Sequence, residues 1–297
     1  MAQADNNPKS IKWITRQRLQ YIELMAFYTG VITRSDIART FGISDAAATK
    51  DLKLYGQLVP DNLIYKHSVF GFVPSSTFKE AFTDLSPAAV LPLIASNMPT
   101  AGAPAENNPV YGVTVEGLPM PSRLPDKEVL AQIIQAIKNH KKLKTRYHSL
   151  SKDNKEEQER IIEPHSLINN GLRWHIRAYN EQSFDFRDFV LSRIVAATCL
   201  DEDAESNQAY DDDWMETVTL ELTPHTQLSE QKRQNLLIDY GVENNIIEVE
   251  VRRALLGYVL QRLSVDTTLD HSLNPNAYQL ILVNREEIEP YAGWAFL

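Results

Sequence analysis

Apolar residues recur at helical spacing in a long stretch near the start of the chain. The pattern predicts a helix over residues 11–29, which the Thr29-Gly30 pair should end because glycine accepts the backbone conformation that closes helices. The positions expected to face a core are Ile11, Ile14, Leu19, Ile22, Met25 and Phe27.

Two shorter helical patterns follow, separated by a glycine. The second helix should start after Thr33, which stands three residues before Asp36 as in a capping box. Gly42 supplies the positive φ that a tight turn between helices requires, and a third helix should start after Ser44. The inner face of this third helix should consist of Ala48, Leu52 and Tyr55.

Residues 63–73 predict two short strands with a turn near His67-Ser68. Helix, helix, glycine turn, helix and β-ribbon is the element order of a winged helix-turn-helix, which indicates DNA binding. A three-helix bundle followed by an ordinary hairpin is the alternative. The outward face of the third helix combines small residues with lysines, which suits base edges and phosphates in a major groove. The candidate DNA contacts are Arg16, Arg18, Arg34, Ser44, Asp45, Ala46, Thr49, Lys50, Lys53, Lys66 and His67.

Prolines punctuate the segment between residues 79 and 128. Two short helices are expected around residues 79–96, before a proline-rich linker that separates domains. The predicted organisation is therefore α+β and multidomain. Its parts are a winged helix-turn-helix (1–80), a helical and proline-rich linker (81–128), a central β-barrel (129–205) and a C-terminal αβ extension (206–297).

The central part predicts one helix, begun at Asp126, followed by about five short antiparallel strands. Such a set of strands fits a small barrel, which removes its own sheet edges by closing. Asn170-Gly171 is expected to form a two-residue hairpin turn between two of the strands.

The strand predicted after this turn has two unlike faces. One face should carry Leu172, Trp174, Ile176 and Ala178, all expected in a core. The other should carry Arg173, His175, Arg177 and Tyr179. Guanidinium groups suit bidentate recognition of phosphate, so the second face indicates a site for an anionic ligand. A solvated strand face is the alternative.

Charge is unevenly distributed along the 297 residues, although the net charge is −9. Basic against acidic residues number 10 against 7 in residues 1–80, 14 against 13 in residues 81–200 and 6 against 19 in residues 201–297. A mildly basic front part is compatible with nucleic acid, while acidic surface in the last third is expected to be solvated. The one cysteine, Cys199, excludes a disulfide within the chain. No secretory leader and no membrane span are evident, and we expect a cytoplasmic protein.

The strings Gly171-Leu172-Arg173-Trp174-His175-Ile176-Arg177-Ala178-Tyr179 and Phe186-Arg187-Asp188-Phe189-Val190-Leu191-Ser192-Arg193-Ile194, with the upstream Tyr147-His148-Ser149-Leu150-Ser151, resemble the WYL-domain family of bacterial transcription regulators. With a winged helix in front and an αβ extension behind, the chain resembles the subgroup that controls phage-defence islands such as BREX. The resemblance implies an Sm-like β-barrel that senses a nucleotide or nucleic-acid fragment, and a homodimer that represses promoters at inverted repeats. Trp174-His175-Ile176 departs from the Trp-Tyr-Leu of the family name, which places a titratable group where a tyrosine is expected.

The resemblance also implies that the ligand pocket is formed by side chains on four of the barrel strands. They are Tyr147, Ser149, Ser151, His165, Arg173, His175, Arg177, Arg187 and Arg193. One or two of the arginines are expected to be structural, paired with Asp185, Asp188, Glu163 or Glu181. Neither histidine has a third histidine or cysteine at metal-ligand spacing, so we expect no metal site and no cofactor.

The last third predicts strand, helix, strand and helix at residues 217–222, 230–240, 246–251 and 254–263, an αβ unit that the resemblance makes a dimer contact. The apolar end, residues 291–297, should be buried in the same or a partner subunit. Neither a nucleophile elbow nor a phosphate loop nor a zinc motif occurs in the sequence, which indicates a protein that is not an enzyme.

The leading hypothesis is a homodimeric, sequence-specific DNA-binding regulator. It would repress a phage-defence operon from an inverted-repeat operator in double-stranded DNA and respond to a nucleotide or nucleic-acid effector. One alternative is an accessory protein that binds single-stranded nucleic acid through the barrel and regulates a partner enzyme. A small-molecule enzyme with its site in the barrel is the other.

Overall fold

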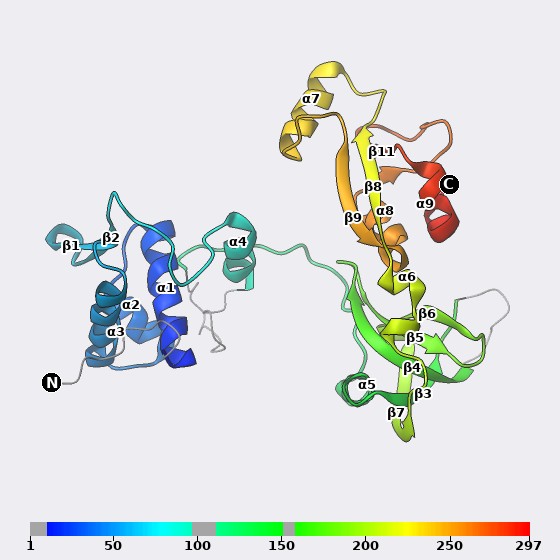
Figure 1. Cartoon of the computed structure of the whole chain (residues 1–297), viewed down its shortest axis with the longest axis horizontal. Coiled ribbons are helices and arrows are strands. Elements are labelled where there is room, and N and C mark those ends of the chain that lie inside the picture. Colours follow the sequence, from blue (N-terminus) through cyan, green and yellow to red (C-terminus); the bar gives the residue numbers. More distant parts are fainter. Residues whose placement is uncertain (1–10, 97–110, 151–157) are drawn as a thin grey trace. The chain divides into compact units, whose positions relative to one another are not determined.

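A computed structural model describes residues 11–96, 111–150 and 158–297. The chain folds into two compact units, Met1–Pro119 and Met120–Leu297, and each is treated by itself below. Figure 1 shows the helices of the first unit in blue to teal and the two sheets of the second in green and in yellow to orange. Within the described residues, no helix is long and apolar enough to cross a membrane.

The first unit has the element order that the sequence predicts. It contains α1 (Trp13–Thr29), α2 (Arg34–Phe41), α3 (Asp45–Leu58), β1 (Leu63–Lys66) and β2 (Gly71–Pro74). The two strands pair antiparallel around a short 3-10 turn. The winged helix-turn-helix arrangement is therefore confirmed.

Local hydrogen bonds explain where α2 and α3 begin. The Thr33 hydroxyl accepts from the Asp36 backbone N–H while the Asp36 carboxylate accepts from the Thr33 backbone N–H, as the capping box predicts. Gly42 ends α2 at φ 61°, a value that side chains other than glycine rarely adopt. The Ser44 hydroxyl accepts from the Ala47 N–H and starts α3.

Burial on α1 differs from the simple amphipathic pattern. Leu19, Ile22 and Met25 are buried as predicted, but the prediction is wrong for Ile14 and Phe27, which are 62% and 50% exposed. The whole run from residue 21 to residue 26 is buried instead. The reason is that α1 is covered on more than one side, because the segment after the wing packs on the same core as α2 and α3.

Glu23 of α1 ties that following segment down. Its fully buried carboxylate accepts hydrogen bonds from the backbone N–H groups of Ala81, Phe82 and Thr83 at 2.9, 3.0 and 3.2 Å. The Tyr55 hydroxyl of α3 donates to the other carboxylate oxygen at 2.9 Å. One helix, α4 (Pro87–Ser96), follows where two were expected, and its Val90 joins the core.

The central part of the second unit consists of one helix, α5 (Lys127–Asn139), followed in the chain by a five-stranded antiparallel sheet. The strands are β3 (Lys141–Tyr147), β4 (Gln158–Asn169), β5 (Trp174–Asn180), β6 (Asp185–Val190) and β7 (Ile194–Asp203). Their order in the sheet is β6-β5-β4-β3-β7, and α5 lies against β7, β3 and β4 (Figure 1). The number of strands agrees with the prediction. In the described part, however, β6 and β7 form no ladder with each other, so closure into an Sm-like barrel is not confirmed.

The turn between β4 and β5 is longer than predicted. Asn170 and Gly171 belong to a loop that ends at Arg173, where the Asn170 side chain accepts from the backbone N–H groups of Leu172 and Arg173. Gly171 has φ 81°, and a Cβ there would lie 2.8 Å from the guanidinium carbon of Arg262. Glycine is therefore required by the positive φ of the turn, while the nearby Arg262 guanidinium is the end of a flexible side chain and could move aside.

The C-terminal part confirms the predicted strand, helix, strand and helix. These are β8 (Thr217–Pro224), α7 (Glu230–Asp239), β9 (Ile247–Arg252) and α8 (Leu256–Arg262). Two further strands, β10 (Val265–Asp266) and β11 (Leu280–Leu282), complete a mixed sheet of order β10-β11-β8-β9. A further helix, α9 (Arg285–Ala292), follows them. The two added strands are too short to produce a recognisable alternation.

The apolar end of the chain is buried only in part. Ala292 and Ala295 lie in the C-terminal core, whereas Tyr291, Trp294 and Leu297 are 48%, 58% and 74% exposed. The Trp294 ring packs directly on Gly257 of α8, where any side chain would collide with it.

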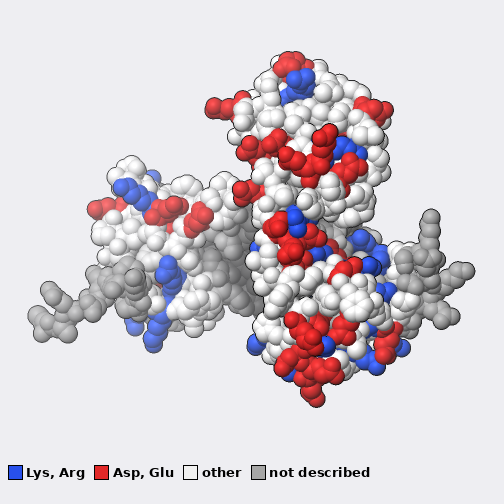
Figure 2. Space-filling view, turned by 45° about the vertical axis from the view of Figure 1, so that its right-hand side comes forward, with Lys and Arg blue, Asp and Glu red and all other residues white. Residues whose placement is uncertain are grey.

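Acidic side chains gather on the face of the second unit that Figure 2 presents, as the charge count of residues 201–297 indicates. DNA phosphates would be repelled by such a face. The contact with duplex DNA is therefore better sought on the first unit.

Candidate nucleic-acid interface and candidate ligand site

The outward face of α3 is open to solvent. Ala46, Thr49, Lys50 and Lys53 are exposed, and the first turn of the helix carries the exposed Asp45. Among the described residues, neither Lys50 nor Lys53 forms an ion pair with a carboxylate. These two ammonium groups are available to an external anion.

A recess of about 600 Å³ separates α3 from the wing. Thr49 and Lys53 line it from α3, Arg34 from α2, and Tyr65 and Phe70 from the wing. The structure thus brings together three of the predicted DNA contacts. It adds two wing aromatics, of which Phe70 is 78% exposed.

The remaining predicted contacts are dispersed around this face. Arg34 approaches Asp45 at 3.5 Å, with both side chains largely exposed. Lys66 and His67 are exposed on the wing, and Arg16 is exposed on α1. Ser44 acts as the cap of α3.

Arg18 requires a correction. Its guanidinium donates to both carboxylate oxygens of Asp51, at 2.6 and 3.2 Å, and Asp51 is almost fully buried on α3. The side chain therefore holds α1 against α3 and is not free to contact a phosphate. The helical spacing of apolar residues did not indicate this ion pair, because Asp51 is a charged residue buried next to Leu52 on the inner side of α3.

The basic face of β5 is not solvated. His175 and Arg177 are 1% and 6% exposed, while Ile176 and Ala178 on the opposite face are also buried. Both faces of the strand are therefore covered, and the alternative of a solvated face is wrong. At the start of the strand the outcome is reversed, because Leu172 and Trp174 are 50% and 38% exposed instead of lying in the core.

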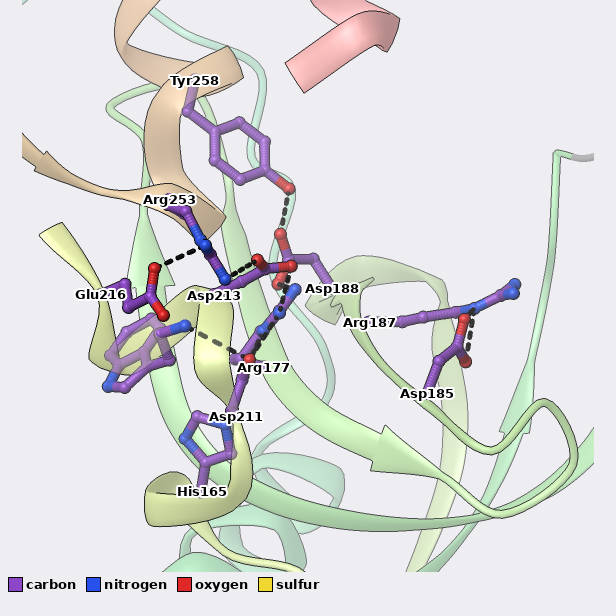
Figure 3. A network of polar contacts seen from close by, with 11 residues as sticks. His165, Arg177, Asp185, Arg187, Asp188, Asp211, Asp213, Glu216, Arg253 and Tyr258 are labelled. Carbon is purple, nitrogen blue, oxygen red and sulfur yellow. Dashed lines mark hydrogen bonds and ion pairs between the residues drawn. The ribbon is translucent and has the colours of Figure 1, made fainter. Parts of the chain in front are cut away.

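Asp211 is the principal partner of Arg177 (Figure 3). It accepts from Nε at 2.6 Å and from Nη2 at 2.9 Å, and it also caps the short helix α6 (Asp212–Met215) through the Trp214 N–H. Burial alone would raise the pKa of Asp211, but the hydrogen bonds from Arg177 and His165 outweigh it and hold that pKa well below its ordinary value. Arg177 is therefore bound within the protein, which makes it one of the structural arginines anticipated from the sequence.

His165 reaches the same carboxylate from a β-bulge. The register of β4 against β5 shifts between Pro164 and Ser166, which leaves His165 as the extra residue. Its Nε2 lies 3.2 Å from Asp211 and its Nδ1 2.9 Å from the Ser166 hydroxyl. The predicted pocket residue is thus part of the buried network.

Asp188 and Tyr258 connect this network to the C-terminal part. The Tyr258 hydroxyl of α8 donates to Asp188 at 2.8 Å, and Arg177 lies 3.4 Å from the other oxygen of that carboxylate (Figure 3). Burial raises the pKa of Asp188 even though Arg177 and Tyr258 oppose it. Figure 3 also shows Arg187 with Asp185 away from the network, on an exposed part of β6.

His175 is the buried residue of the predicted pocket that most resembles a ligand contact. Its Nε2 accepts from the Arg173 Nε at 3.2 Å, and its ring lies 4.9 Å from the Tyr258 ring. Burial, and then the positive charges led by Arg173, lower the pKa of His175 to about 4. The imidazole is therefore neutral at pH 7, and its proton is on Nδ1, which is buried and has no partner among the described residues.

Arg173 and Arg193 have no carboxylate partner among the described residues, and the Arg173 Nε donates to His175. Burial and the charges of other arginines lower the pKa of Arg173. Such a cluster favours an anion, because bringing guanidinium groups together without counter-charge costs free energy.

The other predicted pocket residues differ in their surroundings. Tyr147 is in the core behind the sheet, where its hydroxyl accepts from the Val190 N–H at 3.2 Å. Ser149 is half-buried after β3, and Ser151 lies outside the described residues. In the part of the chain described, no group of three or more histidine, cysteine or acidic residues could hold a metal ion.

Asp211 and Tyr258 were not predicted from the sequence. Asp211 opens a run of three aspartates, which on charge alone indicates solvated surface. Tyr258 is distant in sequence from every predicted pocket residue. The hydrogen-bonding capacity of buried arginines was the available signal, since each needs a carboxylate or another acceptor.

Comparison with known proteins places three family models along the chain. They are the BrxR transcriptional regulator winged helix-turn-helix domain at residues 15–96, the WYL domain at 128–199 and the BrxR transcriptional regulator C-terminal dimerization domain at 217–288.

Curated relatives align over almost the whole length. A DNA-binding transcriptional repressor CapW of Stenotrophomonas maltophilia is 30% identical over 95% of this chain and 93% of its own. Proteins of the same description from Escherichia coli (strain KTE188) and Pseudomonas aeruginosa are each 32% identical, over 93% and 94% of this chain and 91% and 92% of their own. The chain therefore belongs to the BrxR family of WYL-domain transcriptional regulators, with the winged helix, the WYL domain and the dimerization domain in that order.

Proposed function

We propose that this protein is a homodimeric, sequence-specific DNA-binding transcriptional repressor. The observation that carries the proposal is the open cationic face of α3, where Lys50 and Lys53 have no carboxylate partner among the described residues and Thr49 and Lys53 line the recess beside the wing. The description of the relatives as DNA-binding repressors supports it. The protein acts by binding and not by catalysis.

The proposed operator is an inverted repeat in duplex DNA. A dimer built through the C-terminal part, which matches a dimerization domain, presents two copies of α3. Two such helices enter successive major grooves when the half-sites lie about 34 Å apart. Small residues such as Ala46 allow close approach to the bases, while Lys50 and Lys53 neutralise phosphates. The proposed target is a phage-defence operon, in keeping with the subgroup that the sequence resembles.

The effector is proposed to be a nucleotide or nucleic-acid fragment that binds near Arg173, Arg193 and His175. Of the nine predicted pocket residues, these three combine guanidinium groups that have no carboxylate partner among the described residues with a buried imidazole donor. Arg177 and His165 are bound to the buried carboxylate of Asp211, so in this proposal they support the site and do not contact the effector. Binding alters operator affinity only if the effector prefers one dimer geometry over another.

The test is a titration of full-length protein with labelled duplex from the region upstream of its own gene, with random duplex and with single strands of the same length. We expect the upstream duplex to bind most tightly. The double substitution Lys50→Ala, Lys53→Ala should weaken that binding at least tenfold and flatten its salt dependence by about one unit per lost phosphate contact. Lys144→Ala, which removes an exposed lysine paired with Glu159 in the second unit, is the charge-matched control.

Two results would overturn the proposal. Undiminished operator binding by the double variant would remove α3 from the interface. Equal affinity for duplex and single strands would instead favour an accessory protein that binds single-stranded nucleic acid. A reporter fused to the upstream region separates repression from activation, since deletion of the gene should raise expression if the protein represses.

A further inference from the structure

Linker residues form one wall of a recess on the second unit. Residues 121–124, which include Arg123, line it on one side, and the β4–β5 turn with Arg173 and Trp174 lines it on the other. Its volume is about 250 Å³. The linker residues fold with the second unit, yet they fall in the gap between the winged-helix match and the WYL match.

Two arginines, Arg123 and Arg173, line this recess, and the charge of a third, Arg193, acts on Arg173. The charge of Arg123 acts on both Arg173 and His175, as does that of Arg193. None of the three arginines has a carboxylate partner among the described residues. Their mutual repulsion is relieved most directly by an anion with several acceptor oxygens, which guanidinium groups bind in a bidentate manner.

The buried imidazole of His175 is not among the residues that line the recess, but it contacts Arg173, which is, and it has a hydrogen-bond donor unused within the described part of the chain. Because its Nε2 accepts from Arg173, its Nδ1–H is a donor, and that donor is buried without an acceptor among the described residues. Buried donors in native proteins are nearly always satisfied. An oxyanion held by the neighbouring arginines would supply acceptor atoms in this part of the molecule.

Trp174 adds a surface for an aromatic group. Its side chain lines the same recess and is 38% exposed, although the strand pattern placed it in the core. Unpaired guanidinium groups beside an accessible indole are the chemistry that binds a nucleotide, with the phosphate on the arginines and the base stacked on the ring.

We propose that Arg123 of the linker, with Arg173 and Arg193, binds the phosphate of a nucleoside phosphate whose base stacks on Trp174. The bound phosphate then holds linker residues 121–124 against the sheet. The same linker continues toward the winged helix. Occupancy of the recess therefore restricts the segment that joins the WYL domain to the winged helix. This inference rests on the proposed effector response and names a residue and a ligand class for it.

Calorimetric titration of the full-length protein tests the site. The probes are the four nucleoside 5′-monophosphates, the matching nucleosides and inorganic phosphate. At least one monophosphate should bind more tightly than phosphate alone, and Arg123→Gln should weaken it about tenfold or more. Trp174→Leu should remove the advantage of that monophosphate over phosphate. Arg233→Gln, which removes a partly exposed arginine paired with Glu230 on α7, is the matched control and should bind as wild type does.

Limited trypsin digestion tests the effect on the linker. The rate of cleavage after Arg123 in the wild-type protein should fall several-fold when the tightest monophosphate is present at saturation. An unchanged rate overturns the proposed restriction of the linker. Binding by Arg123→Gln that equals the wild type, together with loss in Arg173→Gln, overturns the role of the linker arginine, and the absence of binding by any monophosphate overturns the ligand class. None of these results bears on operator binding, which is measured without nucleotide.

Discussion

Arg177 on β5 donates two hydrogen bonds to Asp211, which lies 34 residues later in the segment that leads into the C-terminal part. The pair is almost fully buried, and it is joined by Asp188, which Tyr258 of α8 also contacts. The central sheet and the dimerization domain are therefore connected by a buried polar network and not by apolar packing alone. Any rearrangement between these two parts has to break or preserve that network as a whole.

Arg177→Ala is expected to lower the free energy of unfolding of the second unit by about 3–5 kcal/mol, because it leaves the carboxylates of Asp211 and Asp188 buried without their cation. Urea unfolding followed by circular dichroism measures this. Arg187→Ala should change the same quantity by less than about 0.5 kcal/mol, since Arg187 is half exposed and pairs with Asp185 on the surface. Equal effects of the two substitutions would contradict the structural role of Arg177. A lost effector response in Arg177→Ala alone would not identify a ligand contact.

His175 should make stability depend on pH in a defined window. Its pKa is 6.5 in an exposed setting and about 4 in the fold. Between these values the unfolded chain binds a proton at this position and the folded chain does not, so stability falls as the pH is lowered. The expected loss from pH 7 to pH 5 is roughly 2 kcal/mol, and below pH 4 it is complete.

His175→Gln should remove that part of the pH dependence. The groups that face the ring are Arg173 on its own strand, Tyr258 from α8 and the more distant charges of Arg193 and Arg123, none of which titrates between pH 5 and pH 7. Thermal unfolding of both proteins at half-unit pH steps provides the comparison. Parallel curves for the wild type and the variant would show that His175 is protonated equally in both states.

Short-range signals made the winged helix predictable. The Thr33–Asp36 capping box, Gly42 and Ser44 act within a few residues of themselves, so the sequence contains the whole of each interaction. The exposed side of α3 could be deduced from the same pattern, since Ala48, Leu52 and Tyr55 are the buried side.

The central site was harder to predict because residues distant in the sequence cover it. Alternation along β5 correctly groups His175 with Arg177, but it does not state what lies above them, and their neighbours Asp211 and Tyr258 come from other elements. Trp174 shows the same limit at the start of the strand, where the sheet ends and a residue of the apolar face is left accessible. The prediction was therefore right that His175 and Arg177 share a face and wrong about how that face is covered. Arg173 and Trp174, predicted on opposite faces, line one recess at the start of the strand.

Arg18 and Lys50 should respond differently to substitution, although both are cations of the first unit. Arg18→Ala should lower the free energy of unfolding by about 2 kcal/mol, because it leaves Asp51 buried without its partner. Lys50→Ala should leave stability nearly unchanged. In operator titrations at several salt concentrations, only Lys50→Ala should reduce the slope of log affinity against log salt, by about one. A reduced slope for Arg18→Ala in folded protein would return this residue to the DNA interface.

Glu23 gives a test of how the segment after the wing is held. Its Oε1 atom accepts three successive backbone N–H groups, from residues 81 to 83, and its other oxygen accepts from Tyr55. Glu23→Gln keeps the size of the side chain but replaces one acceptor oxygen by a donor, so either the amides or the tyrosine hydroxyl lose their partner. We expect amide hydrogen exchange across residues 79–86 to accelerate at least tenfold, which corresponds to about 1.4 kcal/mol or more of local stability. Glu80→Gln is the matched control, since Glu80 is exposed and accepts one backbone N–H, that of Leu85. Exchange that rises equally in the two variants would mean that the buried carboxylate contributes no more than a surface one, and that the segment is held by the apolar contacts of Phe82 and Leu85.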